Sequence, residues 1–281
     1  MMYTEEFCNQ QYNPRNSVKN HLEIMQGWQR KSEYARATWE CYLDVVYGLD
    51  QDERLDVFIA SQPSAPCLIF IHGGYWRGSD KSEFSFIAKA FAKAGATVFL
   101  FNYGLAPRVT LEMIVSQVQR GVQWVYDNAQ QYGGNAEQLF LTGHSAGGHL
   151  TAMMMTMSWA NQQDSIIKGA ITLSGLFDLE PLVHASFLNT VLQLDIPRAK
   201  QLSPTQFRPL SNIPFWTCVG ADESEEFHRQ NELIAKTWPE NFQGDISMPG
   251  CNHFDLMDAL AQTESEVHQA ILKMLQIEVK K

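Results

Sequence analysis

A serine flanked by glycines is the side chain in this sequence best suited to nucleophilic chemistry. Residues 143–147 read GHSAG, directly after the apolar run 139–142 and directly before a helix-forming stretch. This G-x-S-x-G pattern between a strand and a helix predicts a sharp turn that presents the serine hydroxyl at a sheet edge and at a helix N-terminus. A Cβ on Gly143 or Gly147 would collide with neighbouring backbone. We therefore predict that Ser145 is a nucleophile.

A serine hydroxyl needs a base to take its proton and a third group to orient that base. With a nucleophile at a strand-to-helix turn, the acid and then the histidine follow the serine along the chain. His253 lies in a turn-rich loop (249–254), after the last strand-like run and before the last helical stretch. We predict that His253 is the base, and the alternative is a histidine that caps the last helix.

The orienting acid is expected after the strand that precedes this loop. The apolar run 215–220 is that strand, and Asp222 follows it, so we predict Asp222 as the acid. Three glutamates crowd the same loop and are otherwise explained as charges at a helix N-terminus; they are Glu223, Glu225 and Glu226. Asp178 is a weaker candidate for the same role.

Backbone N–H groups must stabilise the oxyanion of a tetrahedral intermediate. Residues 72–76 read HGGYW after the apolar run 68–71, and the two glycines let this loop turn its N–H groups toward the site. We predict that the donors are the N–H groups of Gly74, Tyr75 and Ala146. His72 is expected to be a structural hydrogen-bonding group of the loop.

The residues that flank these donors and the nucleophile are assigned to the substrate pocket. They are Tyr75, Trp76 and His144. For the two aromatic side chains, plain packing in the core is the alternative.

Taken together, these motifs resemble those of the kynurenine formamidase (arylformamidase) branch of the α/β-hydrolases. The segments that carry the resemblance are 72–76, 143–147, 222–230 and 252–255, with weaker similarity at 11–15, 102–103 and 177–182. The resemblance implies hydrolysis, without a cofactor, of N-formylkynurenine to kynurenine and formate, with Ser145, Asp222 and His253 as the catalytic set. One departure is that Glu223-Ser224 follows Asp222 where this family usually has Ser-Pro after the acid.

The same motifs leave the acyl group open, because an elbow and an oxyanion loop specify acyl transfer and not its substrate. The alternatives are a carboxylesterase of broad specificity and a non-catalytic binding protein on a hydrolase fold. The presence of all three reactive side chains together with the glycine loop argues against the binding protein.

Short apolar runs alternate with longer amphipathic stretches along the chain, which predicts a mostly parallel sheet with helices on both faces. Strands are expected at 41–47, 55–60, 67–72, 97–102, 139–142, 170–174, 215–220 and 245–248. Helices are expected at 81–93, 111–131, 147–159, 224–238 and 254–276. The first two strands have no helix between them and should form an antiparallel hairpin at one edge. This pattern predicts an α/β fold with about eight strands, and the family resemblance implies that it is the α/β-hydrolase fold.

We expect a single α/β domain over residues 1–281, because no linker or change in composition divides the chain. The irregular, proline-bearing segment 176–213 is expected to form a small cap over the site, and residues 11–37 to complete it. Loops beyond the carboxyl ends of parallel strands are where ligands bind in such sheets.

The composition disfavours some classes of partner, and the candidate site leads us to expect a small-molecule substrate. The net charge is −10, from 21 basic and 31 acidic residues, and it disfavours nucleic acid or an anionic membrane as a partner. Five separated cysteines and an N-terminus without signal-peptide character favour a reduced, cytoplasmic location. We expect no metal and no cofactor, since the histidines lack ligand spacing. Homodimer formation is left open.

Overall fold

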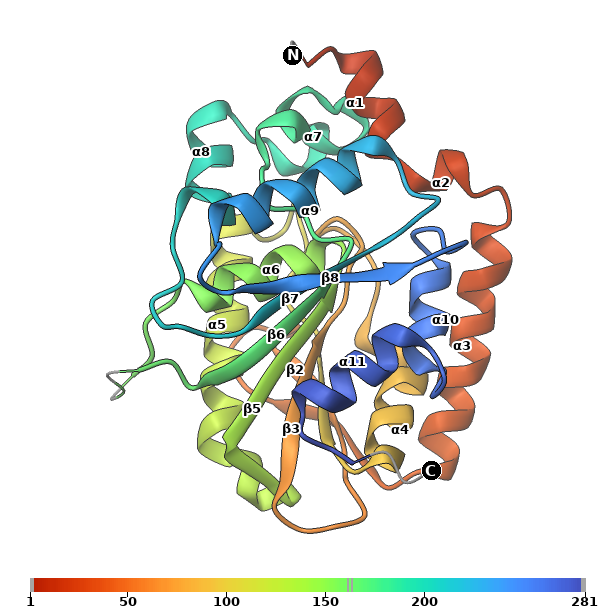
Figure 1. Cartoon of the computed structure of the whole chain (residues 1–281), viewed down its shortest axis with the longest axis vertical. Helices are drawn as coiled ribbons and strands as arrows, with labels where there is room; N and C mark the ends of the chain where they lie inside the picture. Colours follow the sequence, from red (N-terminus) through yellow and green to blue (C-terminus); the bar gives the residue numbers. More distant parts are fainter. Residues whose placement is uncertain (1–2, 161, 163, 279–281) are drawn as a thin grey trace.

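An eight-stranded sheet lies at the centre of the molecule, with helices packed around it (Figure 1). The computed structural model describes residues 3–160, 162 and 164–278. In these ranges the strand order is β1-β2-β4-β3-β5-β6-β7-β8. The strands are β1 (Cys41–Val46), β2 (Arg54–Phe58), β3 (Ala65–Ile71), β4 (Thr97–Phe101), β5 (Gly134–His144), β6 (Ile167–Leu173), β7 (Phe215–Gly220) and β8 (Phe242–Met248). All eight predicted strands are therefore confirmed.

The sheet is parallel except at one edge. β1 pairs with β2, and β2 with β4, in antiparallel fashion, whereas the other five pairings are parallel. The predicted edge hairpin is thus confirmed. In the pairing of β3 with β5, Ile71 lies opposite Gly143, so the glycine loop and the serine turn leave the sheet side by side. This register places the two motifs at one carboxyl edge.

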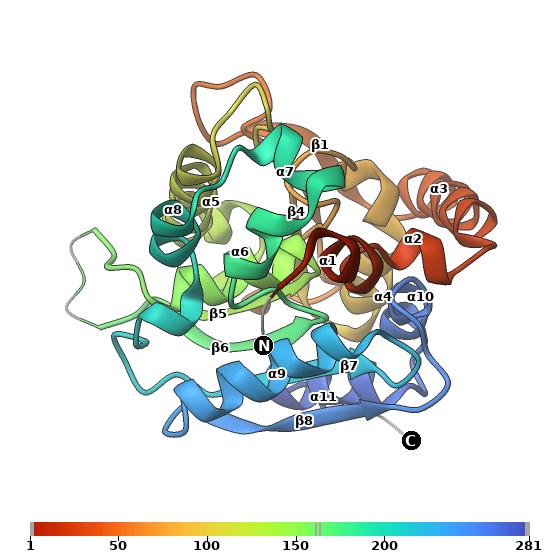
Figure 2. The same ribbon diagram turned by 90° about the horizontal axis from the view of Figure 1, so that it is seen from above.

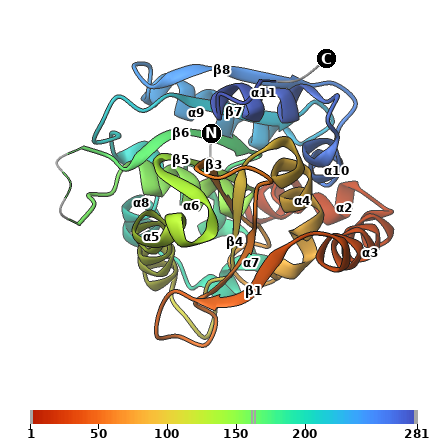
Figure 3. The same ribbon diagram turned by 90° about the horizontal axis from the view of Figure 1, so that it is seen from below.

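The central strands are buried on both faces, which explains their continuous apolar sequence. Along β3, Ile69 belongs to one hydrophobic cluster and Phe70 to the other. On the first face lie α5 (Leu111–Asn128), α6 (Ala146–Met155) and α9 (Glu225–Thr237). On the second lie α4 (Ser85–Ala94), α10 (Asp255–Ala261) and α11 (Glu266–Met274). Figures 2 and 3 show the sheet between α5 and α6 on one side and α4 and α10 on the other.

The last predicted helix, over 254–276, is two helices in the structure. Residues 262–265 separate α10 from α11, and the Ser265 hydroxyl accepts a hydrogen bond from the His268 N–H at 3.2 Å. Serine competes in this way with the continuing helical ladder and starts a new helix. The amphipathic spacing persists across the break, so the pattern alone does not reveal it.

The segments expected to form a cap lie largely over the carboxyl edge of the sheet (Figure 1). They are α2 (Pro14–Ser17), η3 (Glu180–His184), α7 (Ser186–Leu192), α8 (Ile196–Gln201) and η4 (Pro204–Gln206), and α1 (Glu5–Gln11), which precedes the predicted segment, lies beside them. The longer helix α3 (His21–Thr38) instead packs along α4 and the short η1 (Lys81–Phe84). None of the helices in the described ranges is long and apolar enough to cross a membrane.

Candidate active site

Ser145 occupies a strained turn between β5 and α6. Its backbone angles are φ 56° and ψ −119°, and its N–H donates to the Leu173 carbonyl at 2.8 Å. A Cβ on Gly143 would lie 2.3 Å from the Gly147 carbonyl oxygen, and a Cβ on Gly147 would lie 1.9 Å from that of Ile71. Both glycines are therefore required by close backbone approach, as predicted, and the turn holds Ser145 at the edge of the sheet.

The acid that contacts His253 is Glu223, and the prediction of Asp222 is wrong on this point. The Nδ1 atom of His253 lies 2.5 Å from Oε2 of Glu223, and the two side chains are only 6% and 1% exposed. The side chain of Asp222 is exposed. The chain turns directly after β7, where the Glu223 N–H donates to the Gly220 carbonyl at 3.1 Å. That turn directs the second carboxylate of the loop inward and the first one outward.

The Glu223 carboxylate is held by two further donors. Its Oε1 atom accepts from the Ser174 hydroxyl at 2.5 Å and from the Gly220 N–H at 2.9 Å. Because an ionised carboxylate only accepts, His253 carries its proton on Nδ1 when it bonds to Oε2. The Nε2 atom is then left with a lone pair that can take a proton.

His144 positions the loop that carries His253. Its Nε2–H donates to the His253 carbonyl at 2.9 Å, and the two rings lie 4.5 Å apart between centroids. Burial, and then the adjacent His253, hold the pKa of His144 well below its ordinary value of 6.5. His144 therefore stays neutral beside the candidate base and adds no positive charge to it.

The glycine loop lies directly against the nucleophile. A Cβ on Gly73 would approach the Ser145 Cβ to 3.0 Å. Gly74, Tyr75 and Trp76 have φ values of 98°, 51° and 56°, so the loop bends back through three consecutive left-handed residues. In the ranges that the structure describes, the N–H groups of Gly74 and Tyr75 donate to no other protein group. The same holds for the N–H of Ala146, the first residue of α6, so none of the three predicted donors is engaged elsewhere, and their role stays a prediction.

His72 anchors this loop, as predicted from its sequence position. Its Nδ1–H donates to the Gly73 carbonyl at 2.8 Å, and its ring stacks on Tyr103 with centroids 4.5 Å apart. The Tyr103 hydroxyl donates to the His72 carbonyl at 2.8 Å. Burial lowers the pKa of His72. These contacts describe a neutral histidine that stiffens the loop.

Ser145 and His253 line one cleft of about 620 Å³ above the sheet edge. This volume lies within the usual range for small-molecule sites. Tyr75 and His144 line the cleft, as predicted. Trp76 does not: it is wholly buried, packed edge-on against His149 at 5.0 Å between centroids. The bend at Gly74 sends consecutive aromatic side chains in different directions, and Trp76 belongs to the core.

Several cleft residues come from places that the sequence patterns do not connect. The apolar ones are Met25, Trp28, Phe84, Phe187 and Phe254. Trp28 lies 5.7 Å from Phe84 and 6.1 Å from Phe254 between ring centroids, which makes an aromatic wall. Arg15 and Arg77 are the charged residues of the lining. The helical spacing of apolar residues in α3 indicates that Trp28 is buried, but it does not show which element the indole ring packs against.

The N-terminal segment fastens the loops of the site to one another. The Tyr75 hydroxyl donates to the Tyr12 carbonyl, and the Ser224 hydroxyl donates to the Gln11 carbonyl at 2.6 Å. Residues 11–12 therefore connect the glycine loop with the loop that carries Glu223.

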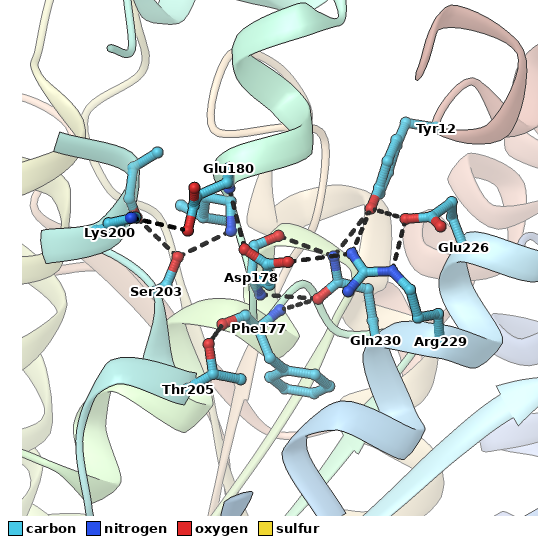
Figure 4. A network of polar contacts seen from close by, with 12 residues as sticks. Tyr12, Phe177, Asp178, Glu180, Lys200, Ser203, Thr205, Glu226, Arg229 and Gln230 are labelled. Atoms are coloured by element: carbon cyan, nitrogen blue, oxygen red, sulfur yellow. Dashed lines mark hydrogen bonds and ion pairs between the residues drawn. The ribbon is translucent and has the colours of Figure 1, made fainter. Parts of the chain in front are cut away.

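A buried polar network extends this connection into α9 and the segment after β6 (Figure 4). The Tyr12 hydroxyl donates to Oε2 of Glu226 at 2.5 Å and accepts from Nε2 of Gln230 at 3.0 Å. Asp178 pairs with Arg229 at 3.2 Å. This ion pair accounts for Asp178, which was the weaker candidate for the orienting acid.

Several known proteins resemble this chain in sequence. Residues 55–207 match the family model BD-FAE. The chain is 31% identical over 287 residues to a kynurenine formamidase from Danio rerio, with 96% of this chain and 94% of that protein covered. It is 32% identical over 269 residues to a kynurenine formamidase from Salmo salar, with 92% and 89% covered.

A solved structure gives the same picture of the fold. The crystal structure of a "putative thioesterase" from Silicibacter sp. TM1040 superposes with a TM-score of 0.82 at 25% identity. The superposition covers 95% of this chain and 96% of that one. The sheet order and this likeness together show an α/β-hydrolase fold.

Proposed function

The chain belongs to the kynurenine formamidase family of the α/β-hydrolases, and from this premise we propose that it hydrolyses N-formylkynurenine to kynurenine and formate. The observation that carries the proposal is His253, which is paired with the buried Glu223 carboxylate and lines the same cleft as the strained Ser145. Such a set performs acyl transfer, and homologous hydrolases use it on amides and esters.

In the proposed first half-reaction, Nε2 of His253 takes the proton of the Ser145 hydroxyl while Oγ attacks the formyl carbon. The N–H groups of Gly74, Tyr75 and Ala146 donate to the oxyanion that forms. The Glu223 carboxylate stabilises the imidazolium. His253 then gives the proton to the aryl amine, the C–N bond breaks, and kynurenine leaves a formyl ester on Ser145.

In the second half-reaction, water attacks the formyl ester. His253 takes a proton from the water, and the same N–H groups stabilise the second oxyanion. Collapse of this intermediate breaks the bond to Ser145 Oγ, which regains its proton from His253, and formate departs. No redox step or external cofactor is needed to balance the reaction.

The lining of the cleft supports an aromatic leaving group. Trp28, Phe84 and Phe254 form a continuous wall in the same cleft as Ser145. Aromatic side chains favour offset or edge contacts with an aryl ring at centroid distances of about 4.5–7 Å. A formyl group is the smallest acyl group, so most of the cleft serves the leaving group.

A carboxylesterase is the second candidate, because an ester is attacked by the same groups and the similar crystal structure is described as that of a thioesterase. The test compares kcat/KM for N-formylkynurenine, followed by the near-ultraviolet absorbance of kynurenine, with kcat/KM for p-nitrophenyl acetate. We expect the formyl amide to be the better substrate. Ester turnover without formyl-amide turnover would overturn the proposed substrate.

Ser145→Ala should abolish both activities while the circular dichroism spectrum stays that of the parent. Ser116→Ala is the matched control: Ser116 lies on α5, and its hydroxyl donates to the Glu112 carbonyl, away from the cleft. Ester turnover that survives in Ser145→Ala would remove Ser145 from the mechanism.

A further inference from the structure

The charge of the cleft is opposite to the charge of the chain. Acidic residues outnumber basic ones by ten in the sequence. In the described part of the chain, however, the residues that line the cleft include Arg15 and Arg77 and no aspartate or glutamate. A cleft lined by one sign of charge focuses the local potential and attracts ligands of the other sign.

Arg77 is held in place without a carboxylate partner. Its Nη1–H donates to the Phe187 carbonyl at 2.7 Å, and its guanidinium carbon lies 5.7 Å from the centre of the Phe187 ring. Within the described ranges, no aspartate or glutamate oxygen lies within ion-pair distance of Arg77. The guanidinium carries five N–H donors, so further donors remain for a ligand.

Arg15 adds a second positive charge to the same cleft. It lies in α2, exposed at the cleft entrance, whereas Arg77 is half-buried. Burial, and then the charge of Arg15, lower the pKa of Arg77. The charge of Arg15 also acts on the Glu83 carboxyl group, whose side chain does not line the cleft. Among the described residues, the Glu223 carboxylate is paired with His253, and neither Arg15 nor Arg77 has a carboxylate within ion-pair distance.

We propose that Arg77, assisted by Arg15, binds a carboxylate on the leaving-group side of the substrate and makes the enzyme selective for aryl amides and esters that carry a carboxylate there. This inference rests on the proposed hydrolysis at Ser145 and names the substrate class of that site. Guanidinium and carboxylate form two parallel, charge-assisted hydrogen bonds, which a neutral substrate cannot replace. The aromatic wall and the arginines would then hold the two ends of one leaving group.

The test uses pairs of substrates that differ only in this charge. The amide pair is 4-(2-formamidophenyl)-4-oxobutanoate, which lacks the α-ammonium group of N-formylkynurenine, and its methyl ester. The ester pair is 3-(2-acetoxyphenyl)propanoate and its methyl ester. For the parent enzyme we expect kcat/KM to be about 10- to 100-fold higher for the anionic member of each pair, the range typical of one charged hydrogen-bonded contact.

Arg77→Met should remove most of this preference through KM and leave the neutral substrates within about threefold of the parent. Arg77→Lys should retain part of it, because the charge remains while the paired geometry is lost. The preference should also be weakened, to a smaller extent, in Arg15→Met. Equal slowing of anionic and neutral substrates in Arg77→Met would assign Arg77 a structural role and overturn the proposal.

A measurement on the unaltered protein guards against misfolding of the variants. 4-(2-Aminophenyl)-4-oxobutanoate, which has the carboxylate but no α-ammonium group, should inhibit ester hydrolysis at about 10-fold lower concentration than its methyl ester, and equal inhibition would contradict the proposal. The ester pair also separates the two claims. If the formyl amides are not cleaved but the anionic ester is preferred and Arg77→Met removes that preference, the proposed substrate fails and the role of Arg77 stands.

Discussion

Replacing Glu223 by glutamine is expected to lower kcat by about 10²–10⁴ with little change in fold. The carboxylate accepts from Ser174 and Gly220 on Oε1 and from His253 on Oε2. A glutamine amide has one oxygen, and the two donors at Oε1 require it there. The amide NH₂ then faces Nδ1 of His253 and donates to it. The imidazole must shift its proton to Nε2, which can no longer take the proton of Ser145.

The magnitude follows from the burial of the pair. Glu223 and His253 are 1% and 6% exposed, so water does not replace the lost contact. Removing one partner of a buried charged pair costs about 3–5 kcal/mol, and each 1.4 kcal/mol is about a factor of ten in rate. The loss should appear in kcat, because the imidazolium that Glu223 stabilises exists only during the reaction.

The assay is kcat for N-formylkynurenine and for p-nitrophenyl acetate at pH 7.5 or so, with Asp222→Asn as the matched control. Because the Asp222 side chain is exposed, its amide should keep kcat within about twofold of the parent. The kcat of Glu223→Asp should lie between those of Glu223→Gln and Asp222→Asn. The shorter side chain keeps the charge but withdraws it from His253 by one bond length, ~1.5 Å. A larger loss in Asp222→Asn than in Glu223→Gln would refute this assignment of the acid.

Three other changes test separate parts of the structure. Gly74→Ala places a Cβ 2.3 Å from the Gly78 carbonyl oxygen at a φ of 98° and should lower kcat by about 10²–10³ through the oxyanion donors. Gly27→Ala, whose Cβ would meet only the end of the Arg30 side chain at 4.0 Å, should leave kcat unchanged; equal kcat values for both variants would contradict the role of the loop. Tyr12→Phe removes the hydroxyl that bonds Glu226 and should lower the free energy of unfolding in urea by about 1–3 kcal/mol; an unchanged midpoint would show that the buried network contributes nothing. Burial lowers the pKa of His149 from 6.5 to about 4. The neutral histidine therefore contributes fully to the free energy of unfolding above pH 6.5, and up to about 3 kcal/mol of it is lost as the pH falls from 6.5 through 4. His149→Gln, which does not titrate, should flatten the fall in unfolding free energy over that range, and an equally steep fall would assign the acid sensitivity to other groups.

The alternation of apolar runs with amphipathic stretches was sufficient to predict every strand and the antiparallel edge. It works because strands buried on both faces must be apolar throughout, as Ile69 and Phe70 show by packing on opposite faces. It failed at residues 262–265, where the hydroxyl of Ser265 starts a new helix without interrupting the apolar spacing. Helix period and helix continuity are therefore separate properties of a sequence.

The candidate nucleophile and the candidate base could be located from the sequence because each is tied to a backbone feature that the sequence encodes. Ser145 is fixed by two glycines that no other residue can replace, and His253 by its loop between a strand and a helix. The carboxylate that contacts His253 belongs to Glu223, one residue after the predicted Asp222. Asp222 and Glu223 both follow β7, and only the turn after Gly220 decides which carboxylate points inward.

A signal for the correct acid was present in the family resemblance. In this family Ser-Pro usually follows the acid. Ser224 follows Glu223, so with Glu223 as the acid the only departure is Glu225 in place of the proline. The lining of the cleft offered no comparable signal. Trp28, Arg77 and Phe187 are far apart in sequence and meet only through the packing of α3 and α7 around the cleft.

The central claim is that one serine performs the chemistry, and covalent labelling tests it most directly. A fluorophosphonate should add one mass adduct to the protein, on the peptide that contains Ser145, and formyl-amide hydrolysis should fall in proportion to the labelled fraction. An adduct on another residue, or hydrolysis that persists when Ser145 is completely labelled, would contradict the account.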